Sequence, residues 1–182
     1  NGKPGADLIV LPAGNTFMLA RVGTDNSALL GDLDITDDVT LLGGSDETTV
    51  VDGAQLDRVF EILNSANVSM ARMTIRNGKT NTDGGGLRVS QGGTVDLRYM
   101  RLTENIAATY GGGLTLAQGT VTIANSLIKL NTAQSGGGID ADDKLILRDV
   151  ELTANTALIH GGGIYASSHN GVEIYDSAIT SN

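Results

Sequence analysis

The sequence contains no cysteine, no tryptophan and only two prolines. The absence of cysteine excludes a disulfide scaffold, a cysteine-ligated zinc or iron–sulfur site and a thiol nucleophile. Only two Phe and four Tyr represent the aromatic residues, so a core must be built from Val, Leu, Ile, Met and Ala. No apolar run approaches the ~20 residues of a membrane-spanning helix.

Basic residues are also scarce. Twelve Lys and Arg stand against 21 Asp and Glu, which gives a formal net charge of −9. The phosphates of nucleic acids and of anionic lipids both require a basic surface, so the composition argues against either partner. Hydrophobic residues make up 40% of the chain, which is enough for a core and argues against global disorder.

Glycine, in contrast, is abundant, with 25 residues, and part of it recurs at a fixed period. Triplets of glycine followed by Leu or Ile, spaced by 27, 25 and 25 residues, begin at Gly84, Gly111, Gly136 and Gly161. An Asn-x-Ala motif recurs with nearly the same period, at Asn105, Asn131 and Asn155. A period of this length indicates a repeat architecture.

Short segments with the periodicity of β-strands lie between these markers. Val95–Leu97 and Met100–Leu102, for example, each alternate between apolar and polar residues, and every regular repeat has counterparts of both. Strands this short cannot bury a face alone, but equivalent strands of successive repeats can stack on one another. The sequence therefore predicts an all-β protein, a right-handed parallel β-helix of about seven coils with three short strands per coil, and no helix in residues 60–182.

We expect one β-helix domain over residues 1–182, with irregular early coils in 1–62 and regular repeats of 24–27 residues in 63–182. The strands expected in the early coils are Leu8–Leu11, Thr16–Leu19, Leu33–Ile35, Val39–Leu41, Thr49–Val51 and Val59–Ile62. Val10, Val39 and Val68 are spaced 29 residues apart, which predicts that they stack in one column.

The recurring asparagines favour a structural role. Asparagines in register can stack their side-chain amides, each donating to the next, and so satisfy buried backbone groups at a turn. We therefore expect Asn105, Asn131 and Asn155 to form a buried ladder.

Several segments resemble a known bacterial family. The segments are residues 5–19, 31–40 and 57–60, the Met73–Gly78 segment, and the glycine-triplet and Asn-x-Ala repeats. Together they are similar to right-handed β-helix surface proteins with a CSLREA-type N-terminal motif and to the repeats of polymorphic outer-membrane proteins. The resemblance covers nearly the whole chain and implies a large secreted or surface-anchored bacterial protein.

The resemblance also implies that this chain is a fragment of a longer protein. The CSLREA segment itself is missing, and Asn182 falls within a repeat. We expect Ile174 and Ile179 of the last coil to lie open, to be covered by further chain, by a partner or by a second copy, and the fragment to associate in solution.

A catalytic alternative comes from a second set of residues. Asn81-Thr82-Asp83-Gly84 matches a signature of polygalacturonase-like hydrolases, and Asp142, Asp143 and His160 follow in that family's order. Such enzymes need their carboxylates around a single glycosidic bond. Asp83 and His160 each precede a glycine triplet, so we expect them in one column, three coils apart, and Asp142 and Asp143 on another edge.

The densest acidic group is Asp32, Asp34, Asp37 and Asp38. Carboxylates can bind Ca²⁺, and this group is the calcium candidate. Otherwise we expect no cofactor, and the group is also consistent with solvated turns.

The sequence thus favours a non-catalytic structural or adhesive scaffold of a bacterial cell surface or extracellular assembly. Its partners would be proteins or copies of itself, bound through the ends or lateral faces of the solenoid. The alternative is a carbohydrate-active enzyme, pectin lyase-like or polygalacturonase-like, acting on acidic polysaccharide.

Overall fold

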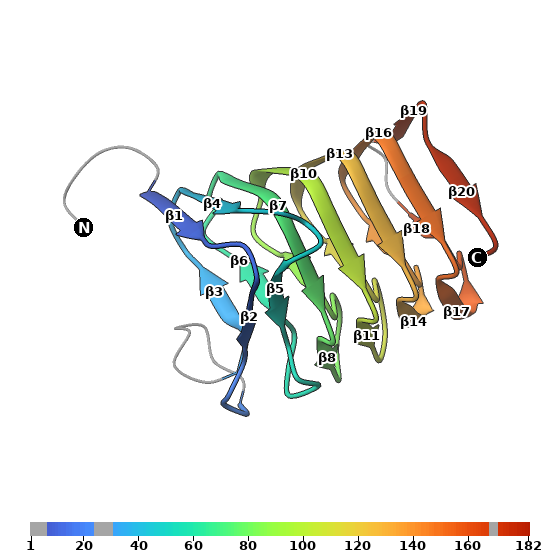
Figure 1. Ribbon diagram of the computed structural model, residues 1–182. Coiled ribbons are helices and arrows are strands. Elements are labelled where there is room, and N and C mark those ends of the chain that lie inside the picture. Colours follow the sequence, from blue (N-terminus) through green and yellow to red (C-terminus); the bar gives the residue numbers. More distant parts are fainter. Residues whose placement is uncertain (1–6, 24–30, 168–170) are drawn as a thin grey trace.

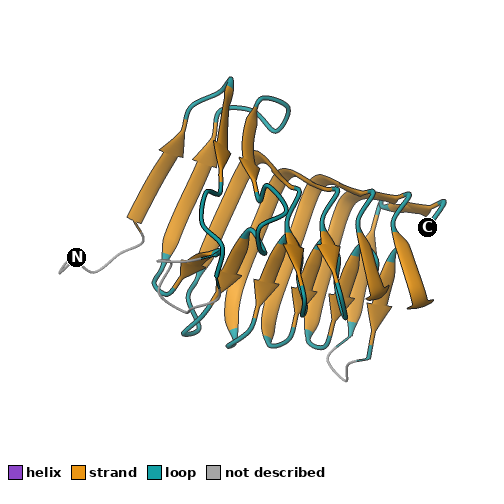
Figure 2. Ribbon diagram, turned by 90° about the horizontal axis from the view of Figure 1, so that it is seen from below, coloured by secondary structure: helices purple, strands orange, loops and turns teal. Residues whose placement is uncertain are grey.

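The computed structural model describes residues 7–23, 31–167 and 171–182. Within these ranges the chain contains strands and turns but no helix, and hence none that could cross a membrane. All strand pairs are parallel, and the chain winds into a right-handed β-solenoid, which confirms the predicted fold class. Figures 1 and 2 show equivalent strands stacked side by side along the rod.

Three sheets run along the solenoid. The long sheet has the path β1 (Asp7–Leu11), β4 (Val39–Gly43), β7 (Val68–Arg76), β10 (Gly93–Thr103), β13 (Gly119–Lys129), β16 (Lys144–Thr153) and β19 (Val172–Tyr175). It also includes β2 (Asn15–Met18), β5 (Thr49–Asp52) and β20 (Ala178–Thr180).

The two other sheets are built from shorter strands. The six-stranded sheet contains β3 (Leu33–Ile35), β6 (Phe60–Ile62), β9 (Leu87–Val89), β12 (Leu114–Leu116), β15 (Ile139–Ala141) and β18 (Ile164–Ala166). The four-stranded sheet contains β8 (Lys79–Thr80), β11 (Ile106–Ala107), β14 (Thr132–Ser135) and β17 (Thr156–His160).

The solenoid has about five turns rather than the predicted seven. The long sheet stacks seven strands along its path, but the two other sheets contribute only six and four. Strand segments in the sequence therefore outnumber complete turns. The predicted early strands all fall on β1 to β6 within a residue or two of their observed ends.

The predicted column of valines is wrong at its first member. Val39 pairs with Val68, but Asp7 rather than Val10 pairs with Val39. Val10 pairs with Leu42 instead, three residues further along the strand. The equal spacing of these valines in the sequence does not reflect the register of the strands, because the first coil is longer than the second.

In the regular coils, the two predicted short strands join into one bent strand. Val95–Leu97 and Met100–Leu102 both belong to β10, which turns at Tyr99, where φ is 52°. The left-handed backbone recurs at the same place in the neighbouring strands, at Arg72, Asn125 and Asp149. The bend points apolar residues on both sides of it into one core, and Met70 and Met73 of β7 stack on Leu97 and Met100.

A ladder of asparagines runs along one corner of the solenoid. The Asn131 Oδ1 atom accepts hydrogen bonds from the backbone N–H and the Nδ2 atom of Asn105, both at 3.0 Å. Asn131 donates in the same way to Asn155, and Asn155 to Asn182. Asn105, Asn131 and Asn155 are at most 1% exposed, so each coil is fastened to the next inside the protein.

The glycine triplets let the backbone of one coil lie directly on the next. Gly136 has a φ of 64°, and a Cβ atom at Gly137 would lie 2.5 Å from the carbonyl oxygens of Thr156 and Gly162. No side chain fits there, because real Cβ atoms do not approach so closely. The triplet thus closes each turn just before a strand of the six-stranded sheet.

Candidate functional site

A row of polar side chains lines the outer face of the six-stranded sheet. The middle residue of each three-residue strand points away from the core, because its neighbours on both sides point inward. In register from β3 to β18, the row consists of Asp34, Glu61, Arg88, Thr115, Asp140 and Tyr165. Glu61, Thr115 and Asp140 are buried although they face outward, so other segments cover this row.

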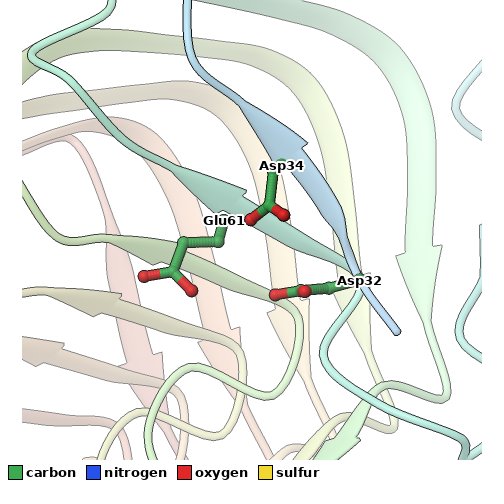
Figure 3. A group of neighbouring side chains, drawn as sticks. All are labelled: Asp32, Asp34 and Glu61. Carbon is green, nitrogen blue, oxygen red and sulfur yellow. The ribbon is translucent and has the colours of Figure 1, made fainter. Parts of the chain in front are cut away.

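At one end of the row, Asp34 and Glu61 meet Asp32. The three side chains lie beside one another (Figure 3), and one carboxylate oxygen from each lies within 4.8 Å of the others. Among the described residues, this is the group of three whose geometry could hold a metal ion. Asp37 and Asp38 do not join it, because Asp38 accepts hydrogen bonds from Asn67 and Asp37 accepts one from the Asp38 backbone.

Arg58 already supplies a cation to this acidic group. Its Nη1 atom lies 2.9 Å from Asp32 and 2.5 Å from Glu61, and all three side chains are buried. Burial raises the pKa of Asp32 to about 6, although Arg58 opposes the shift. Arg88 pairs with the second oxygen of Glu61 at 2.9 Å. The group therefore forms a charge network within the protein. The guanidinium groups of Arg58 and Arg88 supply the positive charge that an added metal ion would otherwise bring.

A cavity of about 450 Å³ opens beside this network. Its lining includes Asp32, Arg58 and Glu61 of this network, the segment Lys79–Thr82, and Val22, Gly23, Leu56 and Asp57. Arg58 also donates hydrogen bonds from Nε to the carbonyl oxygens of Asp83 and Gly84. The guanidinium group thus ties the outer row of the sheet to the loop that precedes the first glycine triplet.

Asp140 differs from the other members of the row. It is 2% exposed, and its Oδ1 atom has no hydrogen-bond partner among the described residues. Burial, together with the negative charges of Asp142 and Asp83, raises its pKa to about 7. Both charges that act on this buried carboxyl group are therefore negative.

Three aromatic rings stack beside Asp140. The Tyr165 ring lies 6.5 Å from that of Tyr110 and 5.6 Å from that of His160, with interplanar angles of 16° and 20°. Tyr110 forms a parallel β-bridge with Ser135, and Ser135 is the strand partner of His160. The stack therefore extends from the coil before Asp140 to the coil after it. Since Tyr165 is also the strand neighbour of Asp140, the stack lies beside the buried carboxyl group.

Two of the four residues expected for a hydrolase, Asp83 and His160, lie in one column of the solenoid. Asp83 and His160 occupy the position before a glycine triplet in their respective coils, with Tyr110 and Ser135 at the same position in the two coils between them. Asp83 accepts a hydrogen bond from Thr109. The column therefore separates Asp83 from His160 by three coil rises, roughly 14 Å.

The pair Asp142 and Asp143 is divided between two environments. Asp142 is exposed and accepts a hydrogen bond from Ser167. Asp143 accepts hydrogen bonds from the backbone N–H groups of Gly119 and Lys144, which places it in a turn.

Sequence reasoning missed Asp140, Glu61 and Arg58. The alternation in Ile139-Asp140-Ala141 does indicate that Asp140 faces outward. What it does not indicate is that the outer face is covered, because the covering groups come from other coils.

No protein-family model matches this chain, and no curated protein or solved structure matches it. The resemblance to bacterial surface β-helix proteins therefore rests on the sequence segments and repeat motifs named above.

Proposed function

We propose that this solenoid is a non-catalytic structural or adhesive scaffold at a bacterial cell surface, of the class formed by CSLREA-type β-helix proteins and polymorphic outer-membrane proteins, which its sequence resembles. One observation carries the proposal. The asparagines that recur in the regular coils bond to their own counterparts in the next coil, as the Asn105–Asn131–Asn155 ladder shows. Such residues stiffen a rod, whereas the groups of a catalytic site converge on one point.

The outer face of the long sheet is the surface that we propose for contact with partners. Two rows of side chains run along it in register: Thr40, Ser69, Asp96, Thr122, Ile146 and Glu173, and Leu42, Ala71, Arg98, Ala124, Arg148 and Tyr175. These rows mix small, charged and apolar side chains. The Arg148 guanidinium lies 4.2 Å from the centroid of the Tyr175 ring. Arg and Tyr are side chains favoured at protein interfaces, so a protein partner or a second copy of the chain suits this face.

Cross-linking on intact cells tests the proposed face. Because the chain has no cysteine, Thr122→Cys introduces a single attachment point for a photo-cross-linker on the long sheet. Asn81→Cys is the matched control, since Asn81 is exposed on the loop before the first glycine triplet. The proposal expects labelling of the domain on unpermeabilised bacteria and cross-linked products from Thr122→Cys. Labelling only after permeabilisation, or equal products from both variants, would overturn it.

The alternative function, cleavage of an acidic polysaccharide, has its own assay. The protein is incubated with polygalacturonate and other acidic glycans, and reducing ends and unsaturated products are measured. Products that disappear in Asp83→Asn and Asp142→Asn would favour the enzyme. The acidic surroundings of Asp140 make this alternative weaker, because they repel a polyanionic substrate.

A further inference from the structure

The cavity beside the Arg58 network has the size of a ligand-binding site and a polar lining. Its volume is about 450 Å³, within the range of roughly 300–1,000 Å³ that small-molecule pockets occupy. Three of its carboxylates, those of Asp32, Asp57 and Glu61, are each at most 7% exposed. Buried carboxylates need cations or hydrogen-bond donors, so the partners of each one decide what this cavity can take up.

Glu61 has a partner for each of its oxygens. Arg58 contacts Oε2 and Arg88 contacts Oε1. The Arg58 guanidinium also donates to Asp32, to Thr82 and to two backbone carbonyl oxygens, so all three of its nitrogens bond within the protein. The charge of Glu61 is therefore balanced by the protein itself.

Asp32 and Asp57, in contrast, each keep one oxygen without a donor among the described residues. Asp32 binds Arg58 through Oδ2, and Asp57 accepts through Oδ1 from the Arg58 backbone N–H. Asp32 Oδ1 and Asp57 Oδ2 accept no hydrogen bond from the described part of the chain, and neither atom is sealed from solvent. A Cβ atom at Gly31 would lie 2.5 Å from Asp57 Oδ2, so this oxygen lies beside the residue that precedes Asp32. These two oxygens are the acceptors that the cavity offers to a ligand.

The negative charge of these two groups is incompletely balanced. Burial raises the pKa of both carboxyl groups, although Arg58 opposes the shift in each. Lys79 lines the same cavity, but it is exposed and forms no ion pair within the described ranges of the chain. A ligand that brings both a positive charge and N–H donors would satisfy the charge and the free oxygens together.

Hydroxyl groups contribute to the polar lining. Thr80 and Thr82 both line the cavity, and their hydroxyl oxygens lie 3.3 Å apart. A hydroxyl group can donate and accept a hydrogen bond, so this pair suits a ligand with hydroxyl groups of its own. The described lining residues include no aromatic ring, and recognition would therefore rest on hydrogen bonds and charge.

We propose that this cavity binds a protonated amine carried by a small hydroxylated molecule, the chemistry of an amino sugar. The ammonium group would donate to the free oxygen of Asp57, with Asp32 adding negative charge, and hydroxyl groups of the ligand would bond to Thr80 and Thr82. The cavity is separate from the partner surface proposed on the long sheet, and binding does not depend on where the protein resides. Each proposal can therefore fail without the other.

The experiment titrates the purified protein in a calorimeter at neutral pH with the trisaccharide of glucosamine and, separately, with the trisaccharide of N-acetylglucosamine. Acetylation removes the positive charge but keeps the ring hydroxyls, so we expect it to weaken binding by about tenfold or more. Asp57→Asn should weaken binding of the glucosamine trisaccharide by a similar factor, because asparagine still accepts from the Arg58 backbone N–H but carries no charge. Asp149→Asn is the matched control. It makes the same change in net charge at an exposed bend of the long sheet and should bind as the wild type does.

A second variant has the opposite expected sign. Lys79→Met removes a positive charge from the cavity lining and should strengthen binding of the glucosamine trisaccharide by up to about fivefold. Three results would overturn the proposal: no binding of this trisaccharide by the wild type, equal binding of its acetylated counterpart, or equal binding by Asp57→Asn and Asp149→Asn. Circular dichroism establishes that each variant is folded. If Asp57→Asn fails to fold, Lys79→Met decides the test, and binding no tighter than that of the wild type refutes the assignment.

Discussion

Replacing Asn131 by alanine tests how much the asparagine ladder contributes to the stability of the solenoid. The side chain is 0% exposed and uses its full hydrogen-bonding capacity. Its Oδ1 atom accepts from the backbone and the side chain of Asn105, and its Nδ2 atom donates to the Leu102 carbonyl and to Asn155. Alanine removes these four bonds and leaves their partners buried.

The expected loss of stability depends on which hydrogen-bond partners of Asn131 keep a second hydrogen bond in the variant. The Asn105 Nδ2 atom still donates to Ile75, and the Asn155 Oδ1 atom still accepts from the Asn131 backbone. The backbone N–H of Asn105 has Asn131 as its acceptor and loses it. An orphaned buried donor costs about 1–3 kcal/mol, and the three weakened partners add to this, so we expect a loss of about 2–4 kcal/mol.

Urea denaturation followed by circular dichroism measures the change, with the slope of the transition compared between variants. Asn81→Ala is the control, since Asn81 is exposed and surface changes usually stay within about 0.5 kcal/mol. Asn131→Asp separates hydrogen bonding from packing, because it keeps the shape but turns a donor into an acceptor that faces the Leu102 and Asn155 oxygens. If Asn131→Ala were as stable as Asn81→Ala, the ladder would contribute nothing beyond filling space.

The regular coils were predictable because their interactions repeat with the sequence. A residue such as Asn131 bonds to its own counterpart one coil away, so the spacing of identical residues already contains the contact. The same holds for Met73 and Met100, which stack in one column. The first coil lacks this advantage. Its length differs from the others, and the alignment of Val10 with Val39 was therefore wrong.

The outer row of the six-stranded sheet could not be predicted in the same way. Its members differ in every coil, and the partner of each one lies on a different element. Glu61 is bound by Arg58 from the loop before β6 and by Arg88 from the next coil. Asp140 is buried although it faces outward, and Tyr165 of the following coil is its strand neighbour. No local pattern encodes such contacts, and so the acidic group drawn from the sequence contained Asp37 and Asp38 but not Glu61.

Three further predictions concern the backbone and the buried charges. Ala154→Gly should stabilise the protein by about 0.5–1 kcal/mol in urea denaturation, because Ala154 has a φ of 53°, whereas Ala157→Gly in β17 should destabilise it by a similar amount. Arg58→Met should cost about 3–5 kcal/mol, since it leaves Asp32 and Glu61 buried without their shared cation. A loss as small as that of an exposed arginine would show that water enters the network.

The last prediction concerns the pKa of Asp140, which burial raises from 3.8 to about 7. The unfolded chain ionises first as the pH rises, so this group favours the folded state below about pH 4, and that contribution is lost as the pH rises toward 7. The difference is roughly 4 kcal/mol. Asp140→Asn cannot ionise, so it should gain stability relative to the wild type over this range, with a constant difference above it. The two proteins differ at this one side chain, so the comparison isolates the contribution of Asp140. Parallel stability curves for the two proteins between pH 4 and 7 would refute the assignment of a buried, uncompensated carboxyl group at Asp140.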